Sequence, residues 1–162
     1  MSCLPLNKIF IWCYILLLQG SVLAQTKDRR FIEFKDKPEF TISTGDEKHL
    51  SLSFIIKEGY HIQANRVNDE NLLPSKLSFE SAEGLIIGDP VYPQADEFRM
   101  EGVKEPLAVF GDTLEIQVPV KTTDTMKKQR FLIKGQLYYQ PCDASKCYYP
   151  REFDFNLSIR VK

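Results

Sequence analysis

Apolar and polar residues alternate one by one along several stretches of the chain, and this alternation restricts the fold more than any other feature. It is clearest at residues 49–57 (HLSLSFIIK), 112–120 (DTLEIQVPV) and 152–161 (EFDFNLSIRV). Because successive side chains of a β-strand point to opposite faces of the sheet, each stretch predicts a strand with one buried and one solvated face. The predicted buried residues are Leu50, Leu52, Phe54, Ile56, Leu114, Ile116, Val118, Val120, Phe153, Phe155, Leu157, Ile159 and Val161.

Shorter strand-like runs lie around and between these stretches, and turn signals separate them. The runs are EFTIS, YHIQA, KLSFE, GLIIG and QRFLIKGQLYYQ, and the turn signals include STGDE, KEGY, GDP and VFGDT. We expect about seven to nine strands and little helix, which is typical of an immunoglobulin-like antiparallel β-sandwich. The predicted class is therefore all-β, with one β-sandwich domain over residues 38–162 and a charged lead-in over residues 25–37.

Residues 1–24 have the composition of a secretory signal peptide. Lys8 supplies a positive charge before the apolar run IFIWCYILLL, and SVLA ends at Ala24 with small or apolar residues that signal peptidase accepts. The apolar run is shorter than the about 20 residues that a membrane-spanning helix needs. We therefore expect cleavage after Ala24, a periplasmic or secreted protein, and a mature chain with only two cysteines, Cys142 and Cys147.

Charge excludes several classes of partner. The formal net charge of the chain is -1, and the basic residues are spread along the sequence. This distribution predicts neither a nucleic-acid surface nor a polybasic patch for membranes, so no nucleic-acid partner is expected. The sequence also shows no serine, histidine and acid arrangement of the kind that indicates a hydrolase.

Cys142 and Cys147 lie in the stretch LYYQPCDASKCYYPREF, between two predicted strands. A hairpin connection there would hold the sulfurs close enough for a disulfide, which an oxidising compartment favours. A structural bridge is the simplest interpretation, although so short a loop gains only about 2 kcal/mol from it. A redox-active pair is an alternative, in which Lys146 beside Cys147 favours a thiolate and Asp143 beside Cys142 disfavours one.

Metal binding is the third interpretation of the cysteine pair. His49 and His61, the only histidines, would complete a set of two sulfurs and two nitrogens. They lie twelve residues apart on separate predicted strands, where a lone histidine is more often solvent-facing or hydrogen-bonded than a ligand. We therefore expect no resident metal.

Three segments together resemble a known family. They are IIKEGYHIQAN, ADEFRMEG and GQLYYQPCDASKCYYP, and the most specific is the block around the two cysteines, from Tyr139 to Pro150. This combination resembles the N-terminal periplasmic domain of the DsbD family of thiol-disulfide interchange proteins, over about Leu50 to Phe155. The resemblance implies an immunoglobulin-like fold whose terminal hairpin carries a redox-active cysteine pair.

The resemblance also implies roles for individual residues. Asp96, Glu97 and Phe98 match the family's cap motif, a short loop whose aromatic ring, here Phe98, shields the disulfide until a partner displaces it. In the family the second cysteine joins partner proteins, which again indicates Cys147. The residues expected to line the site are Tyr60, Tyr139, Lys146 and Tyr148.

Two features depart from the family pattern. His61 and Gln63 stand where the family has tyrosines, and the spacer between the cysteines is one residue shorter than in some members.

Full-length members continue into a transmembrane electron-carrying domain and a thioredoxin-like domain. The resemblance thus implies a thiol-disulfide oxidoreductase module that takes electrons from a thioredoxin-like or membrane donor on a separate chain and passes them to oxidised periplasmic proteins. This exchange needs no metal or organic cofactor. A secreted β-sandwich binding or assembly module with a purely structural disulfide is the alternative.

Overall fold

The computed structural model describes residues 31–35 and 39–162, and every regular element in these ranges is a β-strand. The predicted signal peptide, residues 1–24, lies outside the described residues, as do residues 25–30 and 36–38. Within the described ranges, no helix is long and apolar enough to span a membrane. The strands are β1 (Ile32–Lys35), β2 (Phe40–Ile42), β3 (Glu47–Ile56), β4 (His61–Gln63), β5 (Lys76–Phe79), β6 (Leu85–Ile87), β7 (Asp96–Phe98), β8 (Leu107–Phe110), β9 (Thr113–Thr122), β10 (Arg130–Tyr139), β11 (Pro141–Cys142) and β12 (Arg151–Val161).

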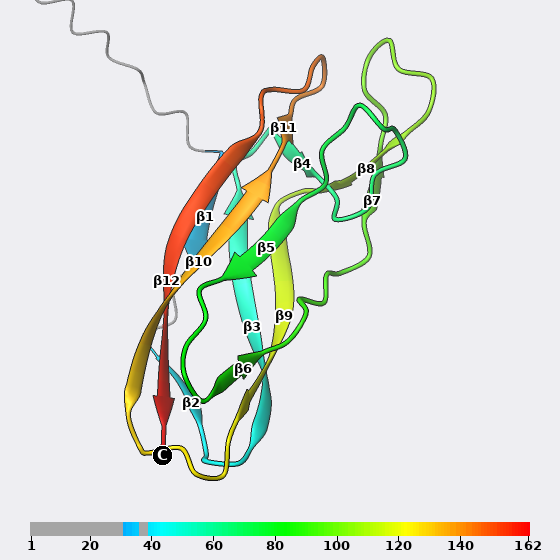
Figure 1. The fold of residues 1–162 in the computed structure, drawn as a ribbon. Coiled ribbons are helices and arrows are strands. Elements are labelled where there is room, and N and C mark those ends of the chain that lie inside the picture. Colours follow the sequence, from blue (N-terminus) through cyan, green and yellow to red (C-terminus); the bar gives the residue numbers. More distant parts are fainter. Residues whose placement is uncertain (1–30, 36–38) are drawn as a thin grey trace, which may run out of the picture.

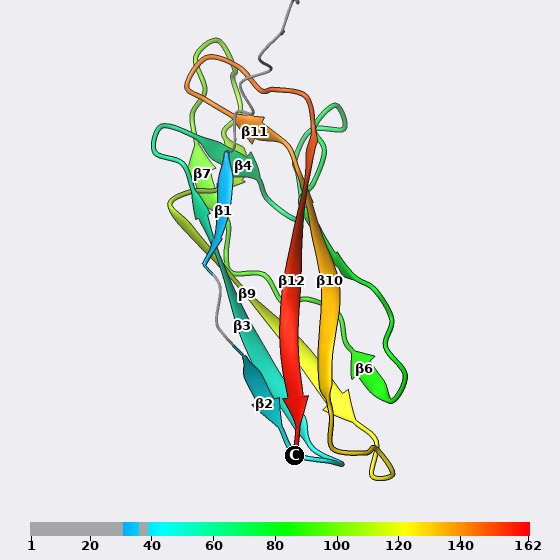
Figure 2. The same cartoon turned by 90° about the vertical axis from the view of Figure 1, so that its left-hand side faces the viewer.

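These strands form three four-stranded sheets, with the orders β1-β3-β9-β6, β2-β12-β10-β5 and β11-β4-β8-β7. Neighbouring strands run antiparallel, except that β12 and β2 pair in parallel. The first two sheets pack face to face, and the third lies at one end of the sandwich, uppermost in Figures 1 and 2. The predicted class, an all-β immunoglobulin-like sandwich, is confirmed.

The core lies between the two larger sheets. Phe54 of β3 and Phe155 of β12 meet across it edge to face, with ring centroids 5.3 Å apart. The alternating residues of β3 and β9 predicted to be buried are all buried, and so are those of β12 except Phe153, which is half-buried. The period of two therefore predicted the face that each long strand turns inward.

The predicted lead-in includes β1, an edge strand of the first sheet. Ile32 pairs with Ile56 of β3, and both Phe31 and Ile32 are buried. The ring of Phe34 lies 4.5 Å from that of Phe155 on the opposite sheet, measured between centroids. The apolar residues of this charged segment thus contribute directly to the core.

The long hairpin of β10 and β12 carries the cysteines across the end of the sandwich. Its two strands pair from Arg130 with Arg160 to Tyr139 with Arg151, as the predicted hairpin requires. The connection includes β11, which leaves the hairpin and pairs with β4 in the third sheet. This departure places Cys142 in a sheet, while Cys147 follows in the loop that returns to β12.

Candidate redox site

Cys142 and Cys147 form a disulfide, and the two residues differ in exposure. Their Cα atoms lie 3.9 Å apart, and the backbones form an isolated antiparallel bridge. Cys142 is 0% exposed, whereas Cys147 is partly exposed. A sulfur atom that arrives from another molecule therefore meets Cys147 before Cys142.

Strand β4 lies beside the buried half of the disulfide. Cys142 pairs with His61, and Pro141 pairs with Ile62. The side-chain amide of Gln63 donates to the Cys142 sulfur, with Nε2 and Sγ 3.1 Å apart, and lies 3.6 Å from the Cys147 sulfur. Gln63 was singled out in the sequence only as a departure from the family tyrosine, so its contact with both sulfurs was missed.

The loop between the cysteines is organised by one carboxylate. Asp143 accepts hydrogen bonds from the Tyr148 hydroxyl at 2.6 Å, from the backbone N–H and hydroxyl of Ser145 at 2.9 Å, and from the backbone N–H of Lys146 at 3.0 Å. The Tyr148 bond and then those from Ser145 hold the pKa of Asp143 well below its usual range. The same bond from its hydroxyl to Asp143 raises the pKa of Tyr148 to about 12.

The predicted cap residues form β7, which pairs with β8 at the edge of the third sheet. The half-buried Phe98 ring stacks on His61, with centroids 4.1 Å apart and planes 31° apart, while Asp96 and Glu97 are exposed. Beyond β7, the backbone N–H of Glu101 donates to the carbonyl oxygen of Ala144 at 3.0 Å. The segment after β7 is thus bonded to the cysteine loop, and Phe98 covers the residue that pairs with Cys142.

Three aromatic rings pack together on another side of the site. The Phe31 ring lies 4.9 Å from that of Tyr60 and 5.3 Å from that of Tyr148, and the two tyrosine rings lie 6.1 Å apart. The Lys146 ammonium lies over the Tyr148 ring, 5.2 Å from its centroid. Tyr139 is buried in the core at the end of β10. Tyr60 and Tyr148 thus lie together, and Phe31 joins them although the sequence did not indicate it.

The metal interpretation is not supported by the described part of the chain. His49 lies on β3 of the first sheet, opposite Pro119, whereas His61 lies on β4 of the third sheet. Among residues 31–35 and 39–162, no three His, Cys, Asp or Glu side chains are grouped so that they could hold a metal ion.

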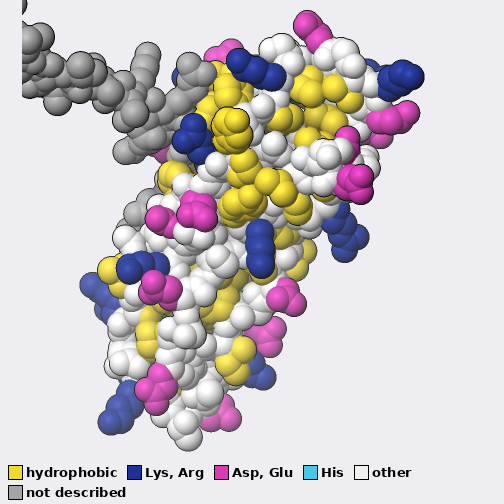
Figure 3. Space-filling model, turned by 45° about the horizontal axis from the view of Figure 1, so that its top comes forward, with side chains coloured by type: hydrophobic (Ala, Val, Ile, Leu, Met, Phe, Trp, Pro, Cys, Tyr) yellow, Lys and Arg dark blue, Asp and Glu magenta, His cyan; other side chains and the backbone are white. Residues whose placement is uncertain are grey.

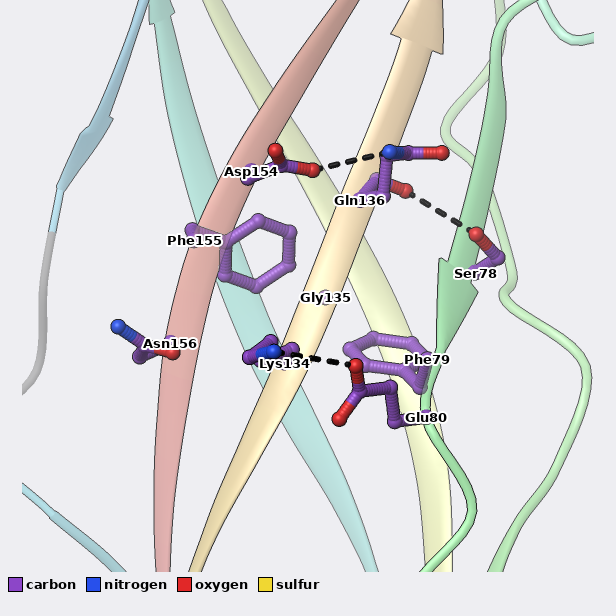
Figure 4. A pocket seen from close by; sticks show the side chains of 9 residues that line it. All are labelled: Ser78, Phe79, Glu80, Lys134, Gly135, Gln136, Asp154, Phe155 and Asn156. Carbon is purple, nitrogen blue, oxygen red and sulfur yellow. Dashed lines mark hydrogen bonds and ion pairs between the residues drawn. The ribbon is translucent and has the colours of Figure 1, made fainter.

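A hollow of about 600 Å³ lies on the sheet of β5, β10 and β12. Four of its polar side chains form two pairs: Lys134 with Glu80 at 3.5 Å, and Gln136 with Asp154 at 2.9 Å. Figure 4 shows these pairs. Because these pairs lie in the middle of the sheet and neither cysteine lines the hollow, it is a feature of sheet packing rather than of the redox site.

The family comparison decides the class of the protein. Residues 28–159 match the family described as "Thiol:disulfide interchange protein DsbD, N-terminal". The chain belongs to this family. The DsbD N-terminal match begins before β1 and covers both cysteines, so it spans nearly the whole described sandwich.

Solved structures of DsbD N-terminal and related domains are also similar. The Neisseria meningitidis DsbD N-terminal domain in its reduced form is 19% identical over 67% of this chain and 74% of that chain, with a TM-score of 0.43. The N-terminal periplasmic domain of ScsB from Proteus mirabilis is 12% identical over 78% of this chain and 44% of that chain, with a TM-score of 0.51. At this identity the ScsB likeness shows the fold alone. No curated protein matches the chain.

DsbD N-terminal family membership and the closed Cys142–Cys147 disulfide together support a thiol-disulfide exchange module. The resemblance predicted from the sequence is thereby confirmed. The roles of Phe98 and its acidic neighbours in access, and the identity of the partners, stay predictions.

Proposed function

We propose that this protein is an exported thiol-disulfide exchange module that works in the periplasm after cleavage of residues 1–24. Its cysteine pair takes reducing equivalents from a thioredoxin-like or membrane donor on a separate chain and passes them to oxidised periplasmic proteins. The observation that carries the proposal is a disulfide with one buried and one partly exposed cysteine in a DsbD N-terminal domain.

Reduction of the pair proceeds in two exchange steps. A donor thiolate attacks the Cys147 sulfur, which forms a mixed disulfide and breaks the bond to Cys142, so that the electron pair leaves on Cys142. The donor's second thiolate then attacks the donor sulfur of the mixed disulfide and releases Cys147 as a thiolate. The donor departs as a disulfide, and the module holds two thiols after protonation by water.

Delivery of the electrons reverses the roles. The Cys147 thiolate attacks a disulfide of the oxidised substrate, forms a mixed disulfide and releases one substrate thiolate. The Cys142 thiolate then attacks Cys147, which restores the Cys142–Cys147 bond and releases the second substrate thiolate. Cys147 is thus the sulfur joined to partners, and Cys142 resolves the intermediate.

Access to Cys147 is the step at which the cap acts. The stack of Phe98 on His61 and the hydrogen bond from Glu101 to Ala144 hold the cap against the cysteine loop. A partner that displaces Phe98 reaches the disulfide, whereas small oxidants and reductants encounter the closed cap. Asp96 and Glu97 are exposed beside Phe98, where they can meet basic groups of a partner.

The same end of the sandwich offers apolar contact area to a partner. Figure 3 shows hydrophobic side chains gathered on the upper part of the molecule, over the third sheet. Tyr149, two residues after Cys147, is 89% exposed, and Val103, in the loop after β7, is 39% exposed. Exposed apolar residues in the segments that follow the cysteine pair and the cap are suited to a transient docking interaction.

The test is the equilibrium potential of the pair. In the chain that retains residues 1–24, Cys3 and Cys13 are replaced by serine so that only Cys142 and Cys147 titrate, and thiols are trapped in graded glutathione or dithiothreitol buffers. A potential of roughly -180 to -270 mV, the range of known exchange proteins, supports the proposal. A potential well below about -300 mV identifies a structural bridge and favours the alternative of a β-sandwich binding or assembly module.

A second experiment tests the polarity of the exchange. In the same background, Cys142→Ala leaves Cys147 free and is expected to accumulate mixed disulfides with a thioredoxin-like protein. The matched variant Cys147→Ala leaves only the buried Cys142 and is expected to accumulate few. Equal trapping by both variants contradicts the assignment of Cys147.

A further inference from the structure

Gln63 is a polar side chain buried against the disulfide. It is 0% exposed, and its backbone is held on both sides: its N–H donates to the carbonyl oxygen of Gln140 at 3.0 Å, and its carbonyl oxygen accepts from the Ser75 hydroxyl at 2.5 Å. The side-chain amide nitrogen lies 3.1 Å from the Cys142 sulfur. The position of this donor is therefore set by the strand and not by a mobile loop.

The other end of the amide lacks a partner. Gln63 Oε1 is buried and has no hydrogen bond within the described residues. A buried acceptor without a partner costs free energy, so the placement of this amide calls for a role of its donor that offsets the cost. The donor faces the sulfurs, so the role is sought in the chemistry of the disulfide.

Reduction of the disulfide places a negative charge on the Cys142 sulfur, in surroundings that stabilise it poorly. When Cys147 is attacked, the electron pair leaves on a sulfur that is 0% exposed, and burial disfavours a thiolate. The neighbouring Asp143 is held in its ionised form by its hydrogen bonds, and its negative charge also disfavours a second anion. In this environment, a neutral hydrogen-bond donor beside the sulfur can stabilise the thiolate.

We propose that Gln63 is a catalytic residue of the exchange reaction, whose amide N–H stabilises the thiolate that forms on Cys142 as the Cys142–Cys147 bond breaks. This inference rests on the proposed exchange function. Hydrogen bonds to an ionised acceptor are stronger than those to a neutral one, so the contact strengthens as charge develops on the sulfur. Gln63 thereby lowers the barrier to reduction and favours the reactive form of Cys142.

Gln63 Oε1 can accept a hydrogen bond in the reduced protein. Once Cys142 carries a proton, its S–H is a donor, and an amide that turns about its last side-chain bond presents Oε1 to it. A glutamine can therefore bond the same sulfur as a thiolate through Nε2 and as a thiol through Oε1. The tyrosine that the family has at this position offers a single hydroxyl for both.

The direct test follows thiolate formation by Cys142 alone. In a chain with Cys3, Cys13 and Cys147 replaced by serine, the thiolate absorbance near 240 nm is titrated with and without Gln63→Met, and the absorbance of the same chain with Cys142 also replaced by serine is subtracted to remove the tyrosine signal. Methionine has a similar length but no N–H donor, so the midpoint of the titration is expected to rise by about one pH unit. An unchanged midpoint overturns the proposal. Gln136→Met, the same change at an amide bonded to Asp154 on the outer sheet face, is expected to leave the midpoint unchanged.

Kinetics separates this inference from the proposed function. In the chain that retains Cys142 and Cys147, Gln63→Met is expected to slow reduction by dithiothreitol about tenfold. If the parent chain shows an exchange-range potential but Gln63→Met reacts at the parent rate, the role of Gln63 is wrong and the proposed function stands. If the parent potential lies in the structural range, the proposed function fails, and the absorbance titration still decides whether Gln63 stabilises the thiolate.

Discussion

Replacement of Phe98 by alanine tests the cap most directly. The Phe98 ring stacks on His61 at 4.1 Å, and the cap is further joined to the cysteine loop by the bond from Glu101 to Ala144. An aromatic pair contributes about 0.5–1.5 kcal/mol beyond its buried area, and a backbone hydrogen bond about 0.5–1.5 kcal/mol. Together they leave an open fraction on the order of 1–20%.

Under the proposed role of the cap, in which its closed form shields the disulfide, the rate of reduction by a small thiol follows this open fraction. Phe98→Ala removes the ring stack and keeps the backbone bond, so reduction is expected to accelerate about two- to tenfold. The reduction rate stops increasing once the cap is open most of the time. Phe98→Tyr keeps a stacking ring and is expected to react at close to the parent rate.

The assay is the pseudo-first-order reduction of the Cys142–Cys147 disulfide by dithiothreitol, stopped at intervals by a thiol-alkylating reagent. Phe131→Ala is the matched control, because Phe131 is also half-buried but lies near the start of β10, at the other end of the sandwich. A general loss of stability would accelerate both variants. If Phe98→Ala reacts no faster than the parent, the stack does not limit access and the cap assignment is refuted.

Three further variants test the surrounding contacts. His61→Ala removes the other half of the stack, so its rate should match that of Phe98→Ala and the double variant should be no faster than either, as a double-mutant cycle of reduction rates would show. Asp143→Asn removes the carboxylate whose hydrogen bond and charge raise the Tyr148 pKa to about 12, so NMR titration should find this pKa closer to 10. The stability that ionised Asp143 contributes is present above its unfolded-state pKa of about 3.9 and is lost as the pH falls through its lowered folded-state pKa. The free energies of unfolding of the parent and Asp143→Asn, measured in urea, should therefore converge in acid. Lys146→Ala should still leave Cys147 alkylated before Cys142, because the burial of Cys142 already makes it the less accessible thiol. Equal alkylation rates in this variant would show that the Lys146 charge sets the order.

The sequence predicted the long strands well because their burial is local and periodic. Strands β3, β9 and β12 each have ten or eleven residues, enough for the alternation of apolar and polar side chains to be recognised. The described chain has twelve strands where seven to nine were expected, and the four without a predicted run, β1, β7, β8 and β11, have only two to four residues each. Runs this short carry no period and are defined by their pairing partners.

The chemical detail of the site was less predictable than its location. The cysteines and the cap segment were found from their motifs, but Gln63 was visible only as a departure from a family tyrosine, and His61 only as such a departure and as a candidate metal ligand. Their contacts depend on β4, β7 and β11, which are distant in the sequence and meet only in the third sheet. The stack of Phe98 on His61 and the amide bond to Cys142 therefore required the structure.

The placement of the third sheet supports the proposed polarity of the exchange, in which Cys147 is the sulfur that a partner attacks. Thiolate attack on a disulfide runs along the bond between the sulfurs, so the attacked sulfur is the one reached from outside and the other one leaves. Cys142 is buried on β11, and Cys147 lies on the exposed return of the loop. Attack on Cys147 thus drives charge inward to Cys142, the sulfur that lies closer to the Gln63 amide, at 3.1 Å against 3.6 Å. Lys146 indicated the same polarity in the sequence, but its ammonium lies over the Tyr148 ring, so strand placement is the stronger cause.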